Sequence, residues 1–362
     1  MRSDARRMLD TVFGAIEAKY RGHHYRRSTK RRLRQSDGGY RNDKEYKSIV
    51  VPYWKRFGQR PRQYWYSLFC VRSKQMDPRY IPDDMWFARV LPYYSNMQFR
   101  RAYEDKCMHS VLFPELSRPK TIVMNIAGVF YDGSFRIIGK EEAVQTCLRE
   151  HEFLIKPSID SGEGRLITFF SGDEVNRDAI QKIIDSLQSN FMVQEVVQQH
   201  RVLANLNEKS LNTIRVISFL FEGEVHILST ILRIGGMDSR VDNVGAGGYA
   251  CKINPNGRLD RYAVNRLSQW VEDHPSGAVF YDTEVPSYEK VLELVRRGHK
   301  KLAHFKIIGW DFAINIAGEP IFIEYNVCPG QNQRTCGPTF GDLTDKVLED
   351  VFIKKSLAGS KN

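Results

Sequence analysis

The sequence predicts an α+β fold in which two sheet-bearing lobes follow a helical N-terminal region. Three observations lead to this prediction. Apolar residues recur at helical spacing before residue 118, and short apolar runs alternate with amphipathic stretches over residues 119–200. Strand-like runs separated by turn residues then continue through residues 201–355. The 362 residues, 42% of them apolar, are enough to bury a substantial core in two or three lobes.

We expect four parts along the chain. They are a basic arm (1–45), a mostly helical region (46–118), a first lobe (119–200) and a second lobe (201–362). In the helical region, Asp83-Asp84 and Ser95-Asn96 are the expected N-caps, because short polar side chains satisfy the free N–H groups where a helix begins.

Each lobe is expected to mix strands with helices. In the first lobe we expect strands at 121–124, 153–156, 166–170 and 191–196, and helices at 140–149 and 178–187. In the second lobe we expect strands around 214, 225–232 and 249–253, a hairpin over 308–327, and a helix at 288–303.

Positive charge is concentrated in the arm. Residues 1–35 carry 11 Lys or Arg and 3 Asp or Glu, a net +8 of the chain's +11. The apolar residues Met8, Leu9, Val12, Phe13 and Ile16 fall on one helical face ahead of the basic run 26–34. Such a segment either lies on an anionic membrane surface, where each basic residue adds about 1 kcal/mol, or packs on the protein's own body. Nucleic acid is a weaker interpretation, because no RNA-binding motif follows.

The composition also indicates a compartment. No apolar run is long enough to span a bilayer, and the arginine-rich start is unlike a secretory signal. The six cysteines lack the spacing of a disulfide framework or a zinc site, so we expect free thiols. We therefore expect a cytoplasmic protein, at the inner face of the membrane if the arm binds lipid.

The segment 308–330 carries the strongest chemical signal. Two apolar runs joined by Ala317-Gly318-Glu319-Pro320 predict a hairpin, with Asp311 in its first strand and Glu324 and Asn326 in its second. Residues two apart in a strand share a face, and the simplest register brings Asp311 to the same face. Three oxygen ligands so arranged suit Mg²⁺. The alternative is an ordinary solvated face, although the apolar flanks make that less natural.

A second constellation lies at residues 152–170. An apolar strand ends at Lys156-Pro157, a small-residue loop follows over 158–164, and a second apolar run begins at Leu166. Glycine and serine let backbone N–H groups close over an anion, and a lysine supplies a point charge to phosphate. The alternative is a plain hairpin. No P-loop or Rossmann glycine pattern is present.

Two more strands complete the pattern. Residues 191–197 form one, and the strand starting at Asn212-Thr213-Ile214 carries Arg215. An arginine in an apolar strand is costly unless its guanidinium meets an anion. That anion is either a ligand phosphate or a structural carboxylate, and the second is favoured for Arg215 considered alone.

These pieces together resemble the ATP-grasp superfamily. The ordered set is Asp105-Lys106, Lys156-Pro157 with its loop, Gln194-Glu195, Asn212 to Arg215, Asp311 and Glu324-Tyr325-Asn326. Three short sequences resemble the sugar-transfer-associated branch found in polysaccharide biosynthesis: Asn212 to Arg215, Gly245 to Gly248 and Gly309-Trp310-Asp311. The resemblance covers residues 78–352 and implies that ATP lies between the two lobes.

The resemblance implies a role for each matching residue. Lys106 and Lys156 would contact the phosphates or the edge of adenine, and the loop with Ser158, Ser161, Gly162 and Gly164 would cover the triphosphate. Gln194, Glu195 and Val197 would bind the adenosine. Arg215 would face the γ-phosphate, and Asp311, Glu324 and Asn326 would hold Mg²⁺. Glu163 departs from the small residue usual in such loops, and Cys328 has no assignable role.

The implied reaction needs ATP, Mg²⁺ and no protein nucleophile. A carboxylate takes the γ-phosphoryl group, and an amine then opens the acyl-phosphate to an amide. We expect a ligase that attaches an amino acid to a sugar of a surface polysaccharide or its lipid-linked precursor. The alternative is a kinase of the same fold acting on a hydroxyl. Incubation with ATP, glycan and pooled amino acids would separate the two by product mass.

The acceptor site is the least determined part of the sequence. Asn212 and the loop residues Asn243, Gly245, Gly247 and Gly248 are candidates for substrate contact, although a plain turn is the favoured interpretation of the loop. Arg334, with Arg233 and Arg240, is a candidate for an acidic sugar or an amino-acid carboxylate, although surface arginines are usually only solvated.

Overall fold

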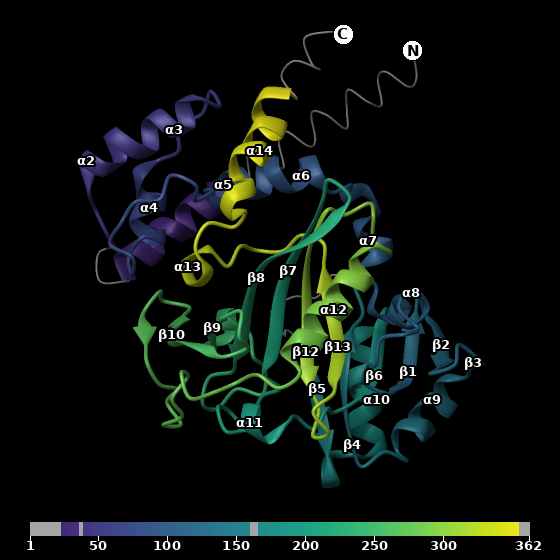
Figure 1. Ribbon diagram of the computed structural model, residues 1–362. Helices are drawn as coiled ribbons and strands as arrows, with labels where there is room; N and C mark the ends of the chain where they lie inside the picture. The colour runs from purple at the N-terminus through teal and green to yellow at the C-terminus, as the bar shows by residue number, and fades with distance from the viewer. Residues whose placement is uncertain (1–22, 36–38, 160–165, 355–362) are drawn as a thin grey trace, which may run out of the picture.

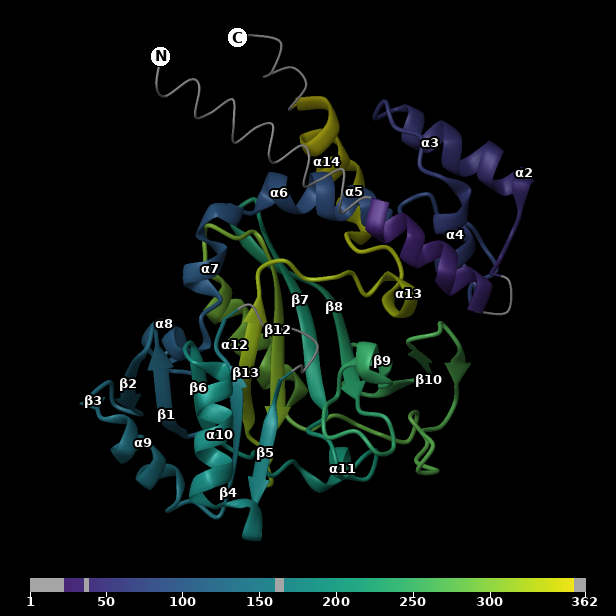
Figure 2. The same cartoon turned by 180° about the vertical axis from the view of Figure 1, so that it is seen from behind.

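Two antiparallel sheets form the centre of the molecule, and helices cover their outer faces (Figure 1). The computed structural model describes residues 23–35, 39–159 and 166–354. The small sheet and its helices lie beside the large central sheet, and the N-terminal helices gather with the C-terminal helices at one end (Figure 2).

The small sheet has six strands in the order β3-β2-β1-β6-β4-β5. Its strands are β1 (Thr121–Ile126), β2 (Val129–Asp132), β3 (Ile137–Ile138), β4 (Glu152–Pro157), β5 (Thr168–Ser171) and β6 (Phe191–Glu195).

Alternation along these strands separates two faces. Phe153, Ile155 and Val193 belong to a core that includes buried residues of the helices α9 (Lys140–Cys147) and α10 (Arg177–Leu187). Lys156 is paired with Met192, and both therefore project from the opposite face. This second face is the one that carries the predicted nucleotide ligands.

The large sheet has seven strands in the order β11-β10-β9-β8-β7-β12-β13. Its strands are β7 (Thr213–Phe221), β8 (Glu224–Ile234), β9 (Tyr249–Ile253), β10 (Leu259–Asn265), β11 (Trp270–Val271), β12 (Ile307–Ile314) and β13 (Pro320–Asn326).

One face of the large sheet is mainly apolar, and it buries the hydroxyls of Ser218 and Thr230 in hydrogen bonds to α12 (Tyr288–His299). Ile214, Val216 and Trp310 on this face share a core with Val291 and Val295 of α12. The other face changes character along β7. Phe221, Phe219 and Ile217 pack in a second core with the N-terminal and C-terminal helices, whereas Arg215 and Thr213 continue the same face as polar residues. The candidate site therefore begins where the helical cover of this face ends.

The N-terminal region consists of short helical segments. They are α2 (Asp43–Glu45), η1 (Tyr46–Val50), α3 (Val51–Lys55), α4 (Gln63–Phe69), α5 (Asp83–Met85), η2 (Trp86–Val90), α6 (Leu91–Tyr94), η3 (Met97–Phe99), α7 (Arg100–Tyr103), η4 (Lys106–Met108) and α8 (His109–Leu112). Both η1 and η2 are π-helical and lie just before Pro52 and Pro92. Proline lacks an N–H donor, which favours a local departure from α-helical bonding.

The remaining segments connect the sheets. They are η5 (Gly172–Glu174), α11 (Arg201–Ala204), η6 (Val244–Ala246), α13 (Gln333–Cys336), η7 (Gly341–Leu343), α14 (Thr344–Leu348) and η8 (Glu349–Lys354).

The predicted α+β class and the helical N-terminal region are confirmed, and the strands expected around Ile214 and at 249–253 form β7 and β9. Asn96 is a cap, since its side chain accepts a hydrogen bond from the N–H of Gln98. The prediction for Asp83-Asp84 was wrong. The helix begins at Asp83 after Pro82, and no side chain caps it. Strand β5 begins at Thr168 because Leu166 adopts a turn conformation with φ 61°.

The described part of the basic arm packs on the protein itself. Residues 23–35 are helical, Arg26 Nε lies 2.7 Å from Asp84 Oδ2, and the Tyr25 ring stacks on Phe87 at 4.2 Å between centroids. Thr29 is buried in this contact region. The apolar face expected at Met8 to Ile16 lies outside the described residues. Among the described helices, none has the length and apolar character needed to cross a bilayer.

Candidate active site

The hairpin β12–β13 has the register that the sequence predicted. Asp311 lies opposite Glu324, and Gly309 lies opposite Asn326. A bulge follows Asp311, because Phe312 pairs with Phe322 and leaves Ile323 as the extra residue. Asp311 and Glu324 therefore project from the same face of the sheet, next to each other.

Asp311 is 1% exposed and is held by two arginines. Arg215 lies directly opposite it on β7 and donates to both carboxylate oxygens, with Nη2 at 2.7 Å from Oδ2. Arg233 on β8 adds a third contact, with Nη2 at 3.1 Å from Oδ2. A buried carboxylate is stable only when its charge is met in this way.

Arg233 also connects Asp311 to a second acid. Its Nε lies 3.2 Å from Asp242 Oδ2, and Asp242 in turn accepts a hydrogen bond from the Thr213 hydroxyl. Burial alone would lower the pKa of Arg233, but Asp242, Asp311 and Glu324 outweigh it and raise that pKa. Arg233 is therefore a fixed cation of the site.

Two lysines reach the same site from the other side. Lys106 Nζ lies 3.3 Å from Glu324 Oε2, and Lys156 on β4 is buried near both. The backbone brings them together, because the Lys106 N–H donates to the Ser158 carbonyl just past the end of β4 at 3.0 Å. Burial alone would raise the pKa of Glu324, but the surrounding lysines and arginines outweigh it and keep that pKa below its usual range.

Lys156 has an unusual protonation equilibrium. Burial lowers its pKa to about 8, against the opposing effect of Glu324 and with a further lowering by Lys106. Glu324 is the carboxylate that opposes this lowering, and it already contacts Lys106. A bound phosphate would add negative charge beside both lysines.

The loop after Lys156 is only partly described. Ser158 is fully buried, and its hydroxyl has no hydrogen-bond partner among the described residues. Ser161, Gly162 and Gly164, with Glu163, lie outside the described residues. Their proposed contacts with the triphosphate remain predictions.

The predicted adenosine-binding residues lie at the end of β6. Gln194 is buried on the same strand face as Met192, opposite Thr121 of β1. The Glu195 carboxylate instead accepts a hydrogen bond from the Lys120 N–H at 2.8 Å, so it secures the start of β1. Val197 is half-buried in the following segment.

Asn212 is not at the surface of the site. It is fully buried, and its amide donates to the carbonyls of Leu203 and Asn207 at 2.8 and 2.9 Å and accepts from the Ser210 hydroxyl. The structure therefore gives Asn212 a bracing function in the chain before β7, in place of the predicted substrate contact.

The glycine loop is a tight turn. The Asn243 side chain accepts a hydrogen bond from the Gly245 N–H, and Gly247 has φ 99°. At Gly248, a Cβ would lie 2.5 Å from the Ile234 carbonyl oxygen. Gly248 is thus needed for close backbone packing, which is the plain-turn alternative.

The candidate acceptor arginines have partners within the chain. Arg240 lies 4.0 Å from the Phe169 ring centroid and 3.7 Å from Glu152, and so links the loop after β8 to the small sheet. Arg334 donates to the Ser268 hydroxyl at 2.7 Å. Burial, with Arg32 nearby, lowers the pKa of Arg334 to about 10 although Asp83 opposes this. Arg334 is the member of this set with the fewest acidic contacts.

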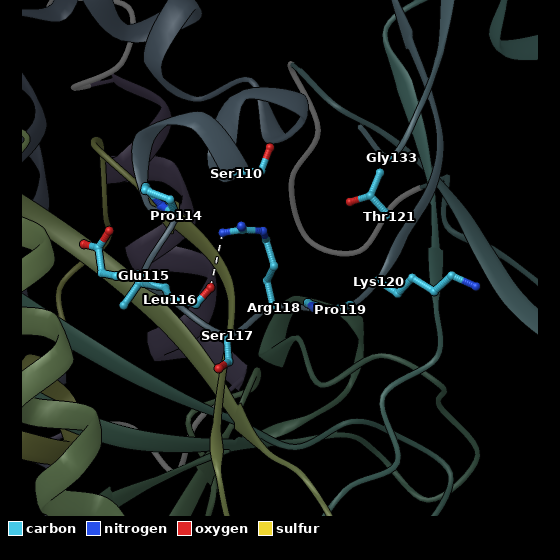
Figure 3. Close-up of a pocket in the computed structure, with 10 residues that line it drawn as sticks. All are labelled: Ser110, Pro114, Glu115, Leu116, Ser117, Arg118, Pro119, Lys120, Thr121 and Gly133. Atoms are coloured by element: carbon cyan, nitrogen blue, oxygen red, sulfur yellow. Dashed lines mark hydrogen bonds between the residues drawn. The ribbon is translucent and has the colours of Figure 1, made fainter. Parts of the chain in front are cut away.

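Two cavities lie along the segment that connects α8 to β1. The larger, about 400 Å³, is polar and includes Arg118, Lys120 and Thr121. Figure 3 shows Arg118 pointing into it, with a hydrogen bond to the Leu116 carbonyl. The smaller lies between the sheets and includes Lys106, Gln194 and Ile323. The two cavities share Ser110, Arg118 and Thr121 in their walls.

The donor set fits Mg²⁺ by its chemistry. Asp311, Glu324 and Asn326 offer two carboxylates and one amide oxygen, and Mg²⁺ usually completes such a set with phosphate and water. In the described ranges, no group of three or more His, Cys, Asp or Glu could hold a metal, and the candidate set here consists of two carboxylates and an amide. If the ion binds, Arg215 and Arg233 would lose part of their contact with Asp311. Lys106 would likewise lose part of its contact with Glu324.

Asp242 of this network and His109 beside it were not predicted from the sequence. Asp242 was not considered, although a buried Arg233 in a strand demands an acidic partner. His109 was also missed. It follows Lys106 by three residues, and the spacing alone would have placed it near the same site.

The fold and the charged site define an ATP-grasp protein, in which two antiparallel sheets lie beside a common charged site. The sequence model of the family described as sugar-transfer associated ATP-grasp matches residues 93–334, and the chain belongs to this family. No curated protein matches the sequence.

Several solved structures are similar in fold at low identity. One is D-alanyl-alanine synthetase A from Vibrio cholerae O1 biovar eltor str. N16961 (TM-score 0.41, 11% identity, 71% of this chain and 65% of that one). Another is D-cycloserine synthetase DcsG (0.43, 12%, 68% and 70%). A third is D-alanine–D-alanine ligase from Bacillus anthracis (0.38, 15%, 72% and 68%). The chain spans less than two thirds of the length of the first of these.

Proposed function

We propose that the protein is an ATP- and Mg²⁺-dependent ligase that joins a carboxylate to an amine through an acyl-phosphate. The observation that supports this most strongly is the meeting of Lys106 and Lys156 with Glu324, beside Asp311 and Arg215. Cations and acids from the two sheets and the η4 segment, gathered in this way, suit a polyphosphate.

The reaction would take place in two steps. A carboxylate oxygen of the first substrate attacks the γ-phosphorus of ATP, and ADP leaves. The amine nitrogen of the second substrate then attacks the acyl carbon, loses a proton and displaces inorganic phosphate. Neither step needs a nucleophile from the protein.

The chain's residues would act by position and charge. Lys156 and Lys106 would hold the phosphates, and Arg215 would stabilise the negative charge that spreads over the transferred group. Asp311, Glu324 and Asn326 would hold Mg²⁺, which neutralises phosphate charge when bound. Gln194 and Val197 would contact the adenosine, and the loop with Ser158, Ser161, Gly162 and Gly164 would exclude water.

The substrate class comes from the family. Its association with sugar transfer supports an amino acid joined to a sugar of a surface polysaccharide or its lipid-linked precursor. A cytoplasmic enzyme that meets such a precursor works at the inner face of the membrane, where the basic residues 1–35 would help to hold it. Arg334, Asn243, Gly247 and Gly248 border the region where we place the acceptor.

A kinase that transfers the same phosphoryl group to a hydroxyl is the second candidate. One observation favours it. Arg233 and Arg240, which would otherwise receive a substrate carboxylate, are tied to acids of the chain itself.

One experiment separates the two reactions. The protein is incubated with ATP, Mg²⁺, a glycan precursor and pooled amino acids, and the product mass is measured. A ligase gives a product heavier by an amino acid less water, and ADP accumulates over many turnovers only when an amine is present. A product heavier by one phosphate without an amine supports the kinase.

A further inference from the structure

His109 carries a buried polar atom that the network described above does not use. It begins α8, directly after the η4 segment that presents Lys106. The side chain is 5% exposed, and its ring lies 5.2 Å from each of the rings of Phe322 and Tyr325 on β13. Nε2 is buried and has no hydrogen-bond partner among the described residues.

Buried polar atoms nearly always have a partner, so a free imidazole nitrogen needs an explanation. His109 lines the smaller cavity, together with Lys106, Gln194 and Ile323. That cavity is about 10 Å³ in this state, room for a single water molecule. A larger ligand enters only when the two sheets move apart.

The walls of this cavity suit a flat heteroaromatic ring. Met192 of the small sheet and Phe322 and Ile323 of the large sheet supply apolar surfaces, whereas Gln194 and Thr121 supply polar atoms. Purine bases match such walls, because they have apolar faces and a rim of hydrogen-bond donors and acceptors. Lys106, at the edge of the same cavity, also contacts Glu324 of the phosphate region.

The imidazole is neutral in these surroundings. Burial, then the positive charges of Lys106 and Lys156, lower the pKa of His109 to about 3, although Glu324 opposes them. A neutral ring offers a single donor or acceptor at Nε2 and adds no further positive charge to the site. It is therefore suited to a base, and not to a phosphate.

We propose that His109 is a specificity-determining residue for the nucleotide, and that its Nε2 hydrogen-bonds the edge of the purine base when the sheets separate to admit it. The inference rests on the proposed use of ATP and adds one contact that distinguishes among nucleotides. If His109 only packed against its neighbours, replacing it would change the affinity for ATP and for its analogues equally.

The test compares nucleotide affinities by calorimetry, with Mg²⁺ and without cosubstrates. Wild type, His109→Phe and His109→Gln are titrated with ATP, 7-deaza-ATP and purine riboside triphosphate, which lack N7 and the 6-amino group respectively. His304→Phe is the matched control, because His304 is exposed and stacks on Phe99 away from the cavity.

We expect His109→Phe to bind ATP about tenfold more weakly, as for the loss of one hydrogen bond. We expect the same variant to bind one of the two analogues as well as wild type does, because that analogue already lacks the contact. His109→Gln should restore part of the ATP affinity, and His304→Phe should leave it unchanged.

Equal losses for ATP and both analogues, or no loss, would overturn the proposal and leave His109 as a packing residue with a bound water. The ¹⁵N shift of Nε2 on addition of ADP gives an answer without any substitution, and an unchanged shift also counts against the contact. If wild type binds no nucleotide at all, the proposed function fails as well, which separates the two failures.

Discussion

Arg215 and Asp311 face each other across β7 and β12, and the guanidinium group donates to both oxygens of the carboxylate. The favoured interpretation of Arg215 from sequence was a structural ion pair, and Asp311 was predicted as a metal ligand. The pairing is compatible with both predictions, because the arginine holds the acid in place and a bound cation would replace part of this contact.

Asp311→Asn should therefore weaken both stability and metal-dependent binding. The substitution leaves Arg215 with a neutral partner in a buried setting, so we expect a loss of about 3 kcal/mol in the free energy of unfolding without metal. Urea denaturation with chelator present measures it. Asp238→Asn is the control, because Asp238 is exposed and its pair with Lys209 contributes little. Equal small effects from both substitutions would contradict the buried pair.

Nucleotide binding should take up a proton near pH 8. The pKa of Lys156 is lowered to about 8 in the free protein, and bound phosphates would raise it again. Above pH 8 the free lysine is largely neutral and must be protonated on binding, so affinity falls as pH rises. Calorimetry at pH 8.5 in two buffers of different ionisation enthalpy measures the proton uptake. Lys156→Met should abolish it, and uptake that survives this substitution would assign the proton to another group.

Gly309→Ala should disturb the loop after β13. A Cβ at this position would lie 2.9 Å from Cβ of Pro329 and 3.5 Å from Cδ of Arg215. Such overpacking costs about 1–3 kcal/mol and would shift the segment that follows Asn326. Denaturation and turnover measure the two effects. Gly139→Ala is the control, since nothing lies within 4 Å of its added Cβ. A wild-type-like Gly309→Ala would show that the loop adapts freely.

Residues 1–35 should be responsible for any membrane binding. Arg26 and Tyr25 pack on the protein, whereas Arg27, Lys30 and Arg31 of the same helix are exposed and can meet lipid. Vesicles with anionic lipid are sedimented with the whole chain and with a variant lacking residues 1–35, at low and high salt. We expect salt-sensitive binding only with the whole chain. Equal binding by both would rule out this segment as the anchor.

Local pattern was sufficient to predict the hairpin. Alternation of apolar and polar residues around Asp311 and Glu324 determines which face they share, and two adjacent strands have few competing registers. The partners of these acids could not be predicted in the same way. Arg215 and Arg233 lie on β7 and β8, and the sheet order that places these strands near β12 cannot be read from local pattern. Lys106 lies on η4, outside both sheets.

Other misses have the same origin. Strands β10 and β11, at one end of the large sheet, have mixed burial, and their sequences lack a clear period of two. Asn212 is polar and close to the site in sequence, yet three-dimensional packing turns its amide toward Leu203 and Asn207. The Nε2 atom of His109 has no hydrogen-bond partner among the described residues, and this could be recognised only from the packing of Phe322 and Tyr325 beside its ring.

The most direct measurement is a crystal structure with Mg²⁺ and a non-hydrolysable ATP analogue. We expect Mg²⁺ bound by Asp311, Glu324 and Asn326, and phosphate oxygens in contact with Lys106 and Lys156. A nucleotide bound elsewhere, with Asp311 still held by both arginines and no metal beside Glu324, would contradict the proposed site.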